Sequence, residues 1–248
     1  MEKKVIQIED LSYSYPDGNA VLSNIDLEVK QDESIGIIGP NGAGKTTLLL
    51  HFNGLLNGNN GITKIKIFDL EMDNKNLTEI RRMVGFVFQE PEDQLFMPTV
   101  YEDVSFGPYN LGWDKDVVRK ETERALEEVS LSNKANQLSH HLSLGEKKRV
   151  SIATVLSMKP RILILDEPSA NLDPAARRHL IDLLKRLPVT KVIAGHDLEL
   201  ILELCNRVIV LDEGRIVADG ETRKILIDSQ LMQRHNLEVP LSLRYKFK

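Results

Sequence analysis

Two partly alternating patterns at the start of the chain predict β-structure. VIQIEDLSYSY and VLSNIDLEVK alternate between apolar and polar positions and are joined by the turn sequence PDGN. SIGIIG follows as a short β-branched apolar run, which is typical of a strand buried on both faces. We therefore expect an antiparallel pair of strands, followed by a strand of a second, buried sheet.

The pattern then becomes helical. GKTTLLLHFNGLL predicts a helix and GITKIKIFDL another strand, but from roughly Asn76 to Leu138 the chain changes character. KDVVRKETERALEEV has helical spacing, with its apolar residues on one face. These features predict a helical subdomain inserted between strands.

Beyond this region, strands and helices alternate. EKKRVSIATVLSM, DPAARRHLIDLLKRL and LELILELC predict helices, RILILDEP and KVIAGHD predict strands, and RVIVLDEGRIVADG predicts a hairpin around Glu213-Gly214. This alternation indicates an α/β sheet with parallel strands at its centre. The last stretch, after Asp219, has a weak helical pattern and then EVPLSLRYKFK, to which we assign no element.

Composition limits the classes of protein to which the chain can belong. The 248 residues are 42% hydrophobic and 28% charged, which suits one large domain with a buried core. The net charge of −5 disfavours a nucleic-acid partner, and Cys205, the one cysteine, excludes a disulfide within the chain. The sequence has no apolar run of membrane-spanning length, so we expect a protein that meets a membrane only by docking on a membrane protein.

A glycine-rich loop carries the clearest chemistry. GPNGAGKT fits G-x-x-x-x-G-K-[ST] and stands between a predicted strand and a predicted helix, as the motif requires. Its glycines let main-chain amides point inward, Lys45 reaches the β- and γ-phosphates, and the Thr46 hydroxyl binds Mg²⁺. The expected phosphate-binding residues are Gly39, Pro40, Asn41, Gly42, Ala43, Gly44, Lys45, Thr46 and Thr47.

Polar residues follow three further apolar strands. Asp166 and Glu167 end ILILDE, His196 ends KVIAGH and Gln89 ends VGFVFQ. Carboxyl ends of parallel strands are where α/β sheets bind ligands. We therefore expect Asp166 and Gln89 in the Mg²⁺ shell, Glu167 as the general base for an attacking water, and His196 at the γ-phosphate.

The stretch HLSLGEKKRV looks like a second anion site, because Ser, Gly and cations gather where a helix begins. Its KKR run, residues 147–149, is too short for a nucleic-acid footprint.

Taken in order, GPNGAGKTT, Gln89, LSLGEKKRV, ILILDEP, SANLD and His196 resemble the ATP-binding subunit of an ABC transporter, over nearly the whole chain. FQEPEDQLF, SFGPYNLG and NLEVPLSL are similar to the energy-coupling-factor group, most of all to its cobalt/nickel branch. The resemblance implies a P-loop NTPase fold of the ABC ATPase kind, with a RecA-like core, an antiparallel β subdomain and an inserted helical subdomain. One domain would span residues 1–248: a core of 1–90 and 160–220, helices at about 91–159 and an extension at about 221–248.

The resemblance also implies a homodimer or heterodimer of ATPase subunits that closes over two ATP molecules. Ser143, Gly145 and Glu146 would face the ATP held by the other subunit, and Asp173 would line the dimer contact. Tyr15 would stack on adenine, although Tyr13 shares its strand face and the residues alone do not decide between them. The chain departs from the usual L-S-G-G-Q signature at Leu144 and Glu146, and Ala170 replaces a usual serine. We expect Glu146 to face the ribose or to pair with a cation such as Lys147.

A transmembrane scaffold subunit and a substrate-binding membrane subunit are the implied partners. Glu92 and Asp93 would dock on arginines of the scaffold, with a solvated acidic turn as the alternative. The implied function is ATP hydrolysis that energises import of cobalt or nickel ions from the cytoplasmic face of the cell membrane, where the subunit is peripheral.

Three other functions fit parts of the sequence. A vitamin importer of the same group would share the ATPase motifs. A soluble ABC-type ATPase acting on DNA or ribosomes would need long coiled coils or two ATPase domains, which this length does not hold. An ATP-binding switch that barely hydrolyses ATP would not need Glu167 and His196.

Overall fold

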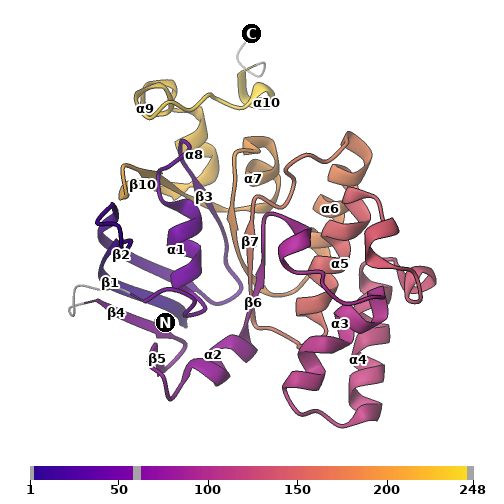
Figure 1. Ribbon diagram of the computed structural model, residues 1–248. Helices are drawn as coiled ribbons and strands as arrows, with labels where there is room; N and C mark the ends of the chain where they lie inside the picture. The colour runs from indigo at the N-terminus through magenta and orange to yellow at the C-terminus, as the bar shows by residue number, and fades with distance from the viewer. Residues whose placement is uncertain (1–2, 58–62, 245–248) are drawn as a thin grey trace.

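The computed structural model describes residues 3–57 and 63–244, which form two β-sheets beside a group of helices (Figure 1). The smaller sheet is antiparallel, with the order β2-β1-β4-β5. Its strands are β1 (Lys4–Ser14), β2 (Ala20–Lys30), β4 (Lys64–Ile67) and β5 (Leu70–Glu71). The predicted antiparallel pair is confirmed. The strand predicted from GITKIKIFDL covers residues 61–70, of which the first two lie outside the described residues. The observed strand β4 ends at Ile67, before the predicted end, because Phe68 has a φ of 54°.

The larger sheet has the order β10-β9-β3-β8-β7-β6. Its strands are β3 (Ser34–Ile38), β6 (Val84–Val87), β7 (Ile162–Asp166), β8 (Thr190–Ala194), β9 (Arg207–Asp212) and β10 (Arg215–Glu221). All neighbouring strands are parallel except β9 and β10, which form the predicted hairpin. Every residue of β7 and β8 is buried, as expected for parallel strands covered on both faces.

Helices cover the larger sheet and extend beyond one edge of it. They are α1 (Lys45–His51), α2 (Leu77–Met83), α3 (Val100–Asn110), α4 (Lys115–Glu128), α5 (Leu144–Leu156), α6 (Pro174–Arg186), α7 (Leu198–Leu204), α8 (Thr222–Ile227), α9 (Ser229–Arg234) and α10 (Leu241–Arg244). Short 3₁₀ turns are η1 (Pro91–Asp93), η2 (Ser132–Lys134) and η3 (Ser139–His141). Helix α1 is shorter than the predicted GKTTLLLHFNGLL, because the chain turns after His51 and Gly54 takes a φ of 67°.

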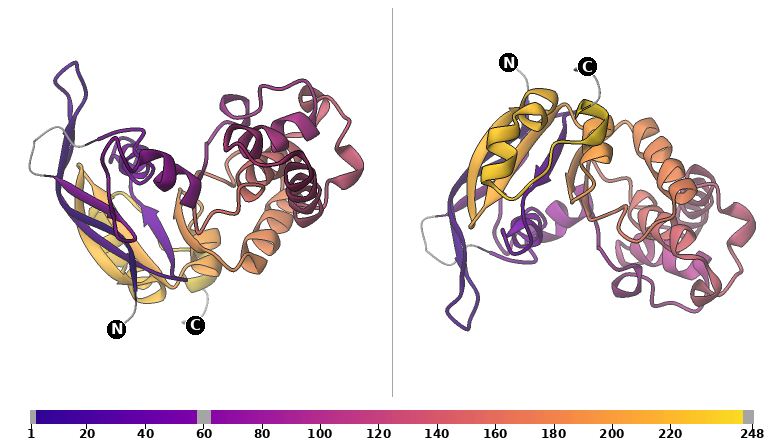
Figure 2. Two further views of the ribbon diagram at one scale, coloured as in Figure 1. Left: turned by 90° about the horizontal axis from the view of Figure 1, so that it is seen from below. Right: turned by 90° about the horizontal axis from the view of Figure 1, so that it is seen from above.

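Two apolar cores hold these layers together. One lies between the two sheets and includes α1, and the other joins the larger sheet to the helices that follow it. Helices α3, α4 and α5 pack on one another and form a lobe to one side of the molecule, in which α5 also packs against β6 of the larger sheet (Figure 2). Helix α4 matches the predicted KDVVRKETERALEEV, and Arg124 fixes it to the end of α5 by donating to the Leu156 carbonyl at 2.8 Å.

The C-terminal segment, which the sequence pattern left unassigned, folds as α8, α9 and α10 at the end of the molecule above β10 in Figure 1. His235 fastens it to the end of β9, with Nδ1 2.7 Å from Asp212 Oδ2. Throughout residues 3–57 and 63–244, every helix is too short or too polar to cross a lipid bilayer.

Candidate ATP-binding and hydrolysis site

The loop between β3 and α1 depends on glycine at two positions. A Cβ at Gly39 would lie 2.0 Å from the Leu211 carbonyl oxygen, which no side chain can tolerate. Gly44 precedes α1 with a φ of 100°, a conformation that L-residues with a Cβ rarely adopt. The loop can therefore pass close to β9 and turn directly into the helix.

Lys45 stands over this loop as a buried cation. Its Nζ donates to the carbonyls of Gly39 at 2.9 Å and Pro40 at 3.1 Å, and to Nε2 of His196 at 3.1 Å. Burial lowers the pKa of the Lys45 ammonium, while the carboxylates of Glu167 and Asp166 oppose that change. A cation held this way can bind an anion that lies above the loop.

Asp166, at the end of β7, is a buried carboxyl group beside the loop. Burial raises the pKa of Asp166, and a hydrogen bond from Thr46 opposes the rise. Within the described part of the chain, its buried Oδ1 has no hydrogen-bond partner. A carboxylate, a hydroxyl and the nearby Gln89 side chain supply the oxygen donors that Mg²⁺ prefers, so these residues fit that ion.

Glu167 follows Asp166 with an uncommon backbone. Its φ is 44°, and its N–H donates to the Ala194 carbonyl at 2.9 Å. The carboxylate accepts from the His196 main-chain N–H at 3.1 Å and lies 3.4 Å from the ring Nε2. The end of β7 is thereby joined to the end of β8, and a carboxylate and an imidazole share one site.

These strand ends line one cavity of about 320 Å³. Its walls are Val21, Asn41, Gly42, Ala43, Gly44, Lys45, Thr46, Thr47, Gln89, Glu167 and His196. Ten of these residues were expected from the sequence, and Val21 was not, because its strand β2 carries no chemical motif. Gly39 and Pro40 support the site through their carbonyls instead.

A neighbouring cavity of about 360 Å³ extends the site toward α6. It shares Asn41, Gln89, Glu167 and His196 with the first and adds Ser169, Ala170, Asn171 and Asp197. Of the added residues, Ser169, Ala170 and Asn171 belong to the motif SANLD, and Asp197 was not expected from the sequence. Ala170 lacks the hydroxyl of the usual serine, yet the loop is held by main-chain bonds from Ala170 to Glu167 and from Leu172 to Ser169.

The two candidate tyrosines differ in burial. Tyr13 is 9% exposed and packs edge-on against the ring of His51 at 4.9 Å. Tyr15 is 37% exposed, and its hydroxyl lies 3.1 Å from Thr47 Oγ1 beside the phosphate loop. Tyr15 is therefore the tyrosine whose ring is accessible to a base.

The signature residues lie apart from the cavity, at the start of α5. Ser143 and Glu146 form a capping box: Ser143 Oγ accepts from the Glu146 N–H at 3.3 Å, and Glu146 Oε2 accepts from the Ser143 N–H at 2.9 Å. The bond from the Ser143 N–H lowers the pKa of Glu146 most, and the bond that Ser143 Oγ donates to Oε2 at 3.0 Å lowers it further. Glu146 pairs with a cation, as one of the two expectations had it, but Lys147 is the wrong residue: Glu146 lies 3.5 Å from Lys134, while Lys147 binds Glu92 at 2.6 Å.

Gly145 lies where the start of α5 meets the start of α6, the helix that Asp173 caps. A Cβ at Gly145 would lie 2.7 Å from Cβ of Ala176, so the two helix starts touch. Asp173 caps α6 by accepting from the N–H groups of Ala175 and Ala176, both at 2.8 Å. Ser143, Gly145, Glu146 and Asp173 thus form a second surface, distinct from the cavity.

The fold and the groups around the cavity define a phosphate-loop ATPase cassette with an antiparallel β subdomain and a helical subdomain. The sequence profile of a family described as ABC transporter matches residues 22–170. An ABC transporter ATP-binding protein of Gloeobacter violaceus is 51% identical over 95% of this chain and 97% of its own. The energy-coupling factor transporter ATP-binding protein EcfA of Methanococcus maripaludis is 44% identical over 95% of this chain and 86% of its own.

Solved structures of ABC transporter cassettes are similar to this fold. The structure of cbiO1 from Clostridium perfringens, described as part of the ABC transporter complex cbiONQ, has a TM-score of 0.83 and 36% identity and covers 99% of both chains. A dimeric post-hydrolysis structure of the cassette MJ0796, bound to ADP and Pi, has a TM-score of 0.79 and 28% identity over 88% of this chain and 99% of its own. The chain belongs to the ATP-binding proteins of the ABC transporter family. Its activity is transport-coupled ATP hydrolysis.

Replacing Lys45 with Ala should weaken ATP binding by about 10- to 100-fold, since a hydrogen bond from a charged donor contributes about 1.5–3 kcal/mol. Fluorescence titration with a labelled ATP analogue measures the affinity. Lys64→Ala, at an exposed lysine of β4, is the control and should bind as the wild type does. Unchanged affinity in the Lys45 variant would contradict the assignment of the loop.

Proposed function

We propose that this chain is the ATP-hydrolysing subunit of an energy-coupling-factor importer for cobalt or nickel ions. The observation that carries the proposal is the convergence of Lys45, Asp166, Glu167 and His196 at one sheet edge. The type of importer is supported by the similarity to EcfA and to cbiO1. The cargo is supported by the motifs FQEPEDQLF, SFGPYNLG and NLEVPLSL.

ATP binding is assigned to the first cavity. The amides of the loop and the Lys45 ammonium hold the phosphates, and the Tyr15 ring stacks on adenine. Thr46, Asp166 and Gln89 hold Mg²⁺, which when bound neutralises charge on the phosphate oxygens.

Hydrolysis is assigned to Glu167 and His196. The Glu167 carboxylate accepts a proton from the attacking water, and Gln89 orients that water. His196 Nε2 accepts from Lys45 in this structure, so its Nδ1 carries the proton in that arrangement. Donation from Nε2 to the γ-phosphate therefore requires a protonated ring, or the other tautomer with Lys45 turned toward the phosphates.

A second copy of the chain, or a paralogue, completes the site. Ser143 and Gly145 present a hydroxyl and an amide to the partner's γ-phosphate, and Asp173 lines the contact. The capping box holds Glu146 against Ser143, and Ser143 Oγ donates to Glu146 Oε2 at 3.0 Å, so this hydroxyl must turn from the carboxylate before it donates to the phosphate. Closure of the dimer on ATP and reopening after hydrolysis would drive the membrane partner.

Glu167→Gln should lower kcat by about 10²- to 10⁴-fold, because the amide cannot accept the proton from water. ATP affinity should stay near that of the wild type, and the variant should accumulate as an ATP-bound dimer. Phosphate release and size-exclusion chromatography measure the two effects. Ordinary turnover in this variant would remove Glu167 as the base.

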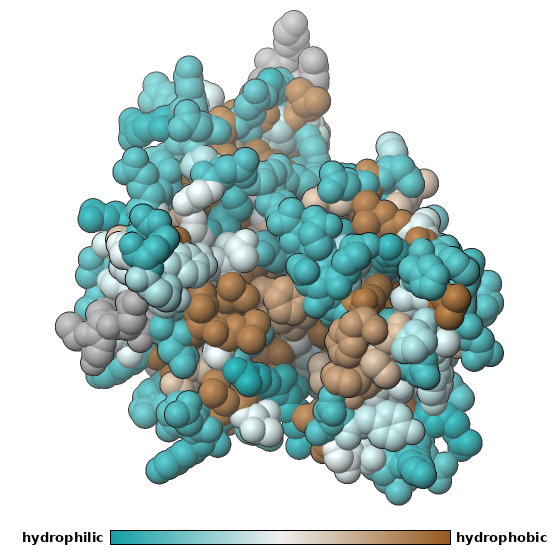
Figure 3. Space-filling view, in the orientation of Figure 1, coloured by the Kyte–Doolittle hydropathy of each residue, from teal (hydrophilic) through white to brown (hydrophobic). Residues whose placement is uncertain are grey.

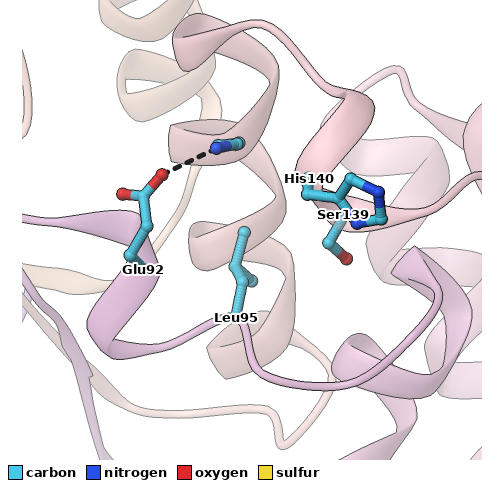
Figure 4. A pocket seen from close by; sticks show the side chains of 5 residues that line it. Glu92, Leu95, Ser139 and His140 are labelled. Carbon is cyan, nitrogen blue, oxygen red and sulfur yellow. Dashed lines mark hydrogen bonds and ion pairs between the residues drawn. The ribbon is translucent and has the colours of Figure 1, made fainter.

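Docking on the membrane partner is assigned to η1 and the start of the helical lobe. Figure 3 shows apolar side chains gathered near the middle of one face and over the helical lobe. Phe96 and Phe106 stack edge-on at 4.8 Å, and Tyr109 follows one turn later, 52% exposed. Beside them, Glu92 and Lys147 form an ion pair at 2.6 Å on the wall of a cavity of about 70 Å³ that Leu95 and His140 also line (Figure 4). An apolar surface next to an acidic turn suits a helix that carries arginines.

Reversing the charges, with Glu92→Lys and Asp93→Lys together, should abolish assembly with the membrane partner while the isolated chain still hydrolyses ATP. Co-purification from membranes and an ATPase assay measure the two effects. The control, Glu123→Lys with Glu127→Lys, reverses two exposed charges on α4. A complex that forms and transports normally in the η1 variant would overturn the docking assignment.

The importer assignment is tested by purifying the tagged chain from native membranes. We expect a transmembrane scaffold and a substrate-binding membrane subunit to co-purify, and vesicles holding the complex to take up Co²⁺ or Ni²⁺ with ATP. Uptake of a vitamin instead would show that the chain serves the alternative importer, which carries vitamins. Recovery with ribosomes or DNA alone would overturn the proposal.

A further inference from the structure

Lys148 is a buried lysine that joins three parts of the molecule. It lies near the start of α5, and only 3% of its surface is exposed. Its Nζ donates to the main-chain carbonyl of Gln89 at 2.6 Å and to that of Glu167 at 3.2 Å. A buried ammonium must be hydrogen-bonded, and both of these acceptors belong to residues assigned to hydrolysis.

The two carbonyls follow neighbouring strands. Strands β6 and β7 run in parallel, with Val87 opposite Leu165, and the chain reaches Gln89 and Glu167 two residues later in each case. One side chain on α5 therefore fixes where both chain segments leave the sheet.

The backbone of Glu167 is held from two sides. Its N–H donates to Ala194, its φ is 44°, and its carbonyl accepts from both Ala170 and Lys148. A residue in this left-handed conformation persists only where its surroundings hold it. Without the Lys148 bond the Glu167 carbonyl would be held by the Ala170 N–H alone, so the peptide after Glu167 would be less restrained and the carboxylate would shift.

We infer that Lys148 is a positioning residue for ATP hydrolysis, which sets the places of the Gln89 amide and the Glu167 carboxylate through their main-chain carbonyls. This inference rests on the proposed roles of those two residues. The phosphate loop is held by separate contacts, those of Lys45 and the glycines, so nucleotide binding should not depend on Lys148.

The charge of Lys148 fits this place. Burial lowers the pKa of its ammonium, while the carboxylates of Glu90, Glu167, Asp166 and Glu92 oppose that change. The cation therefore lies among the acidic groups of the site. An apolar side chain of similar length would take this donor from the Gln89 carbonyl and leave the Glu167 carbonyl with the Ala170 N–H alone.

Lys191 offers a matched control. It is also buried, 7% exposed, and its Nζ donates to two main-chain carbonyls, of Leu187 at 2.8 Å and Val189 at 3.0 Å. Burial lowers the pKa of this ammonium too. Lys191 lies at the amino end of β8, whereas the site lies at the carboxyl ends of the strands.

The experiment compares Lys148→Met with Lys191→Met in the full chain. Both should lower thermal stability, but only Lys148→Met should lower kcat for ATP, by about 100-fold, since a misplacement of 1 Å can cost that much. KM should stay within about twofold, because phosphate binding is intact. Assays are run at a temperature where circular dichroism shows each variant folded. Lys148→Arg, which keeps the charge and the donors, should restore part of kcat.

Wild-type kcat in Lys148→Met, or an equal loss in Lys191→Met, would overturn the inference. Should Lys148→Met fail to fold, Lys148→Arg is compared with Lys191→Arg: a lower kcat at unchanged KM in the first alone supports the inference, and equal values overturn it. Glu167→Gln is assayed in parallel. If that variant hydrolyses ATP normally, the proposed role of Glu167 fails, whatever Lys148 does.

Discussion

Parallel pairing of β3, β8, β7 and β6 is the constraint on which the site depends. Parallel strands end at the same edge, so the residues that follow them must lie together, although they come from distant parts of the chain. Lys45, Gln89, Glu167 and His196 meet in this way around one cavity. The close approach of Gly39 to Leu211 and the hydrogen bond from Glu167 to Ala194 then fix distances between the site residues that strand pairing alone does not determine.

Much of this arrangement could be predicted from the sequence, because it depends on local pattern. Apolar runs ending in polar residues identified β6, β7 and β8 with their terminal groups, and helical spacing identified α4 almost to the residue. The sequence could not show which of Tyr13 and Tyr15 stacks on adenine, because both lie on one strand face. Their burial differs through tertiary contacts, such as the packing of Tyr13 against His51.

Contacts between distant segments were harder to predict. The partner of Glu146 is Lys134, which lies twelve residues earlier in the turn η2, and not the adjacent Lys147. In the sequence, Lys148 is one residue of the basic run KKR. Nothing in that run indicates that its side chain points inward to the main-chain carbonyls of Gln89 and Glu167. Burial of a lysine depends on the tertiary fold, so no local pattern reveals it.

The start of α5 also constrains how related chains can vary. Gly145 and Ala176 leave no room for a larger side chain at either position, since even a Cβ at 145 would lie 2.7 Å from that of Ala176. A substitution at one of these positions would push α5 away from α6 and alter the surface that carries Ser143 and Asp173. Residues 145 and 176 should therefore evolve as a pair, with any gain in size at one requiring the helices to separate.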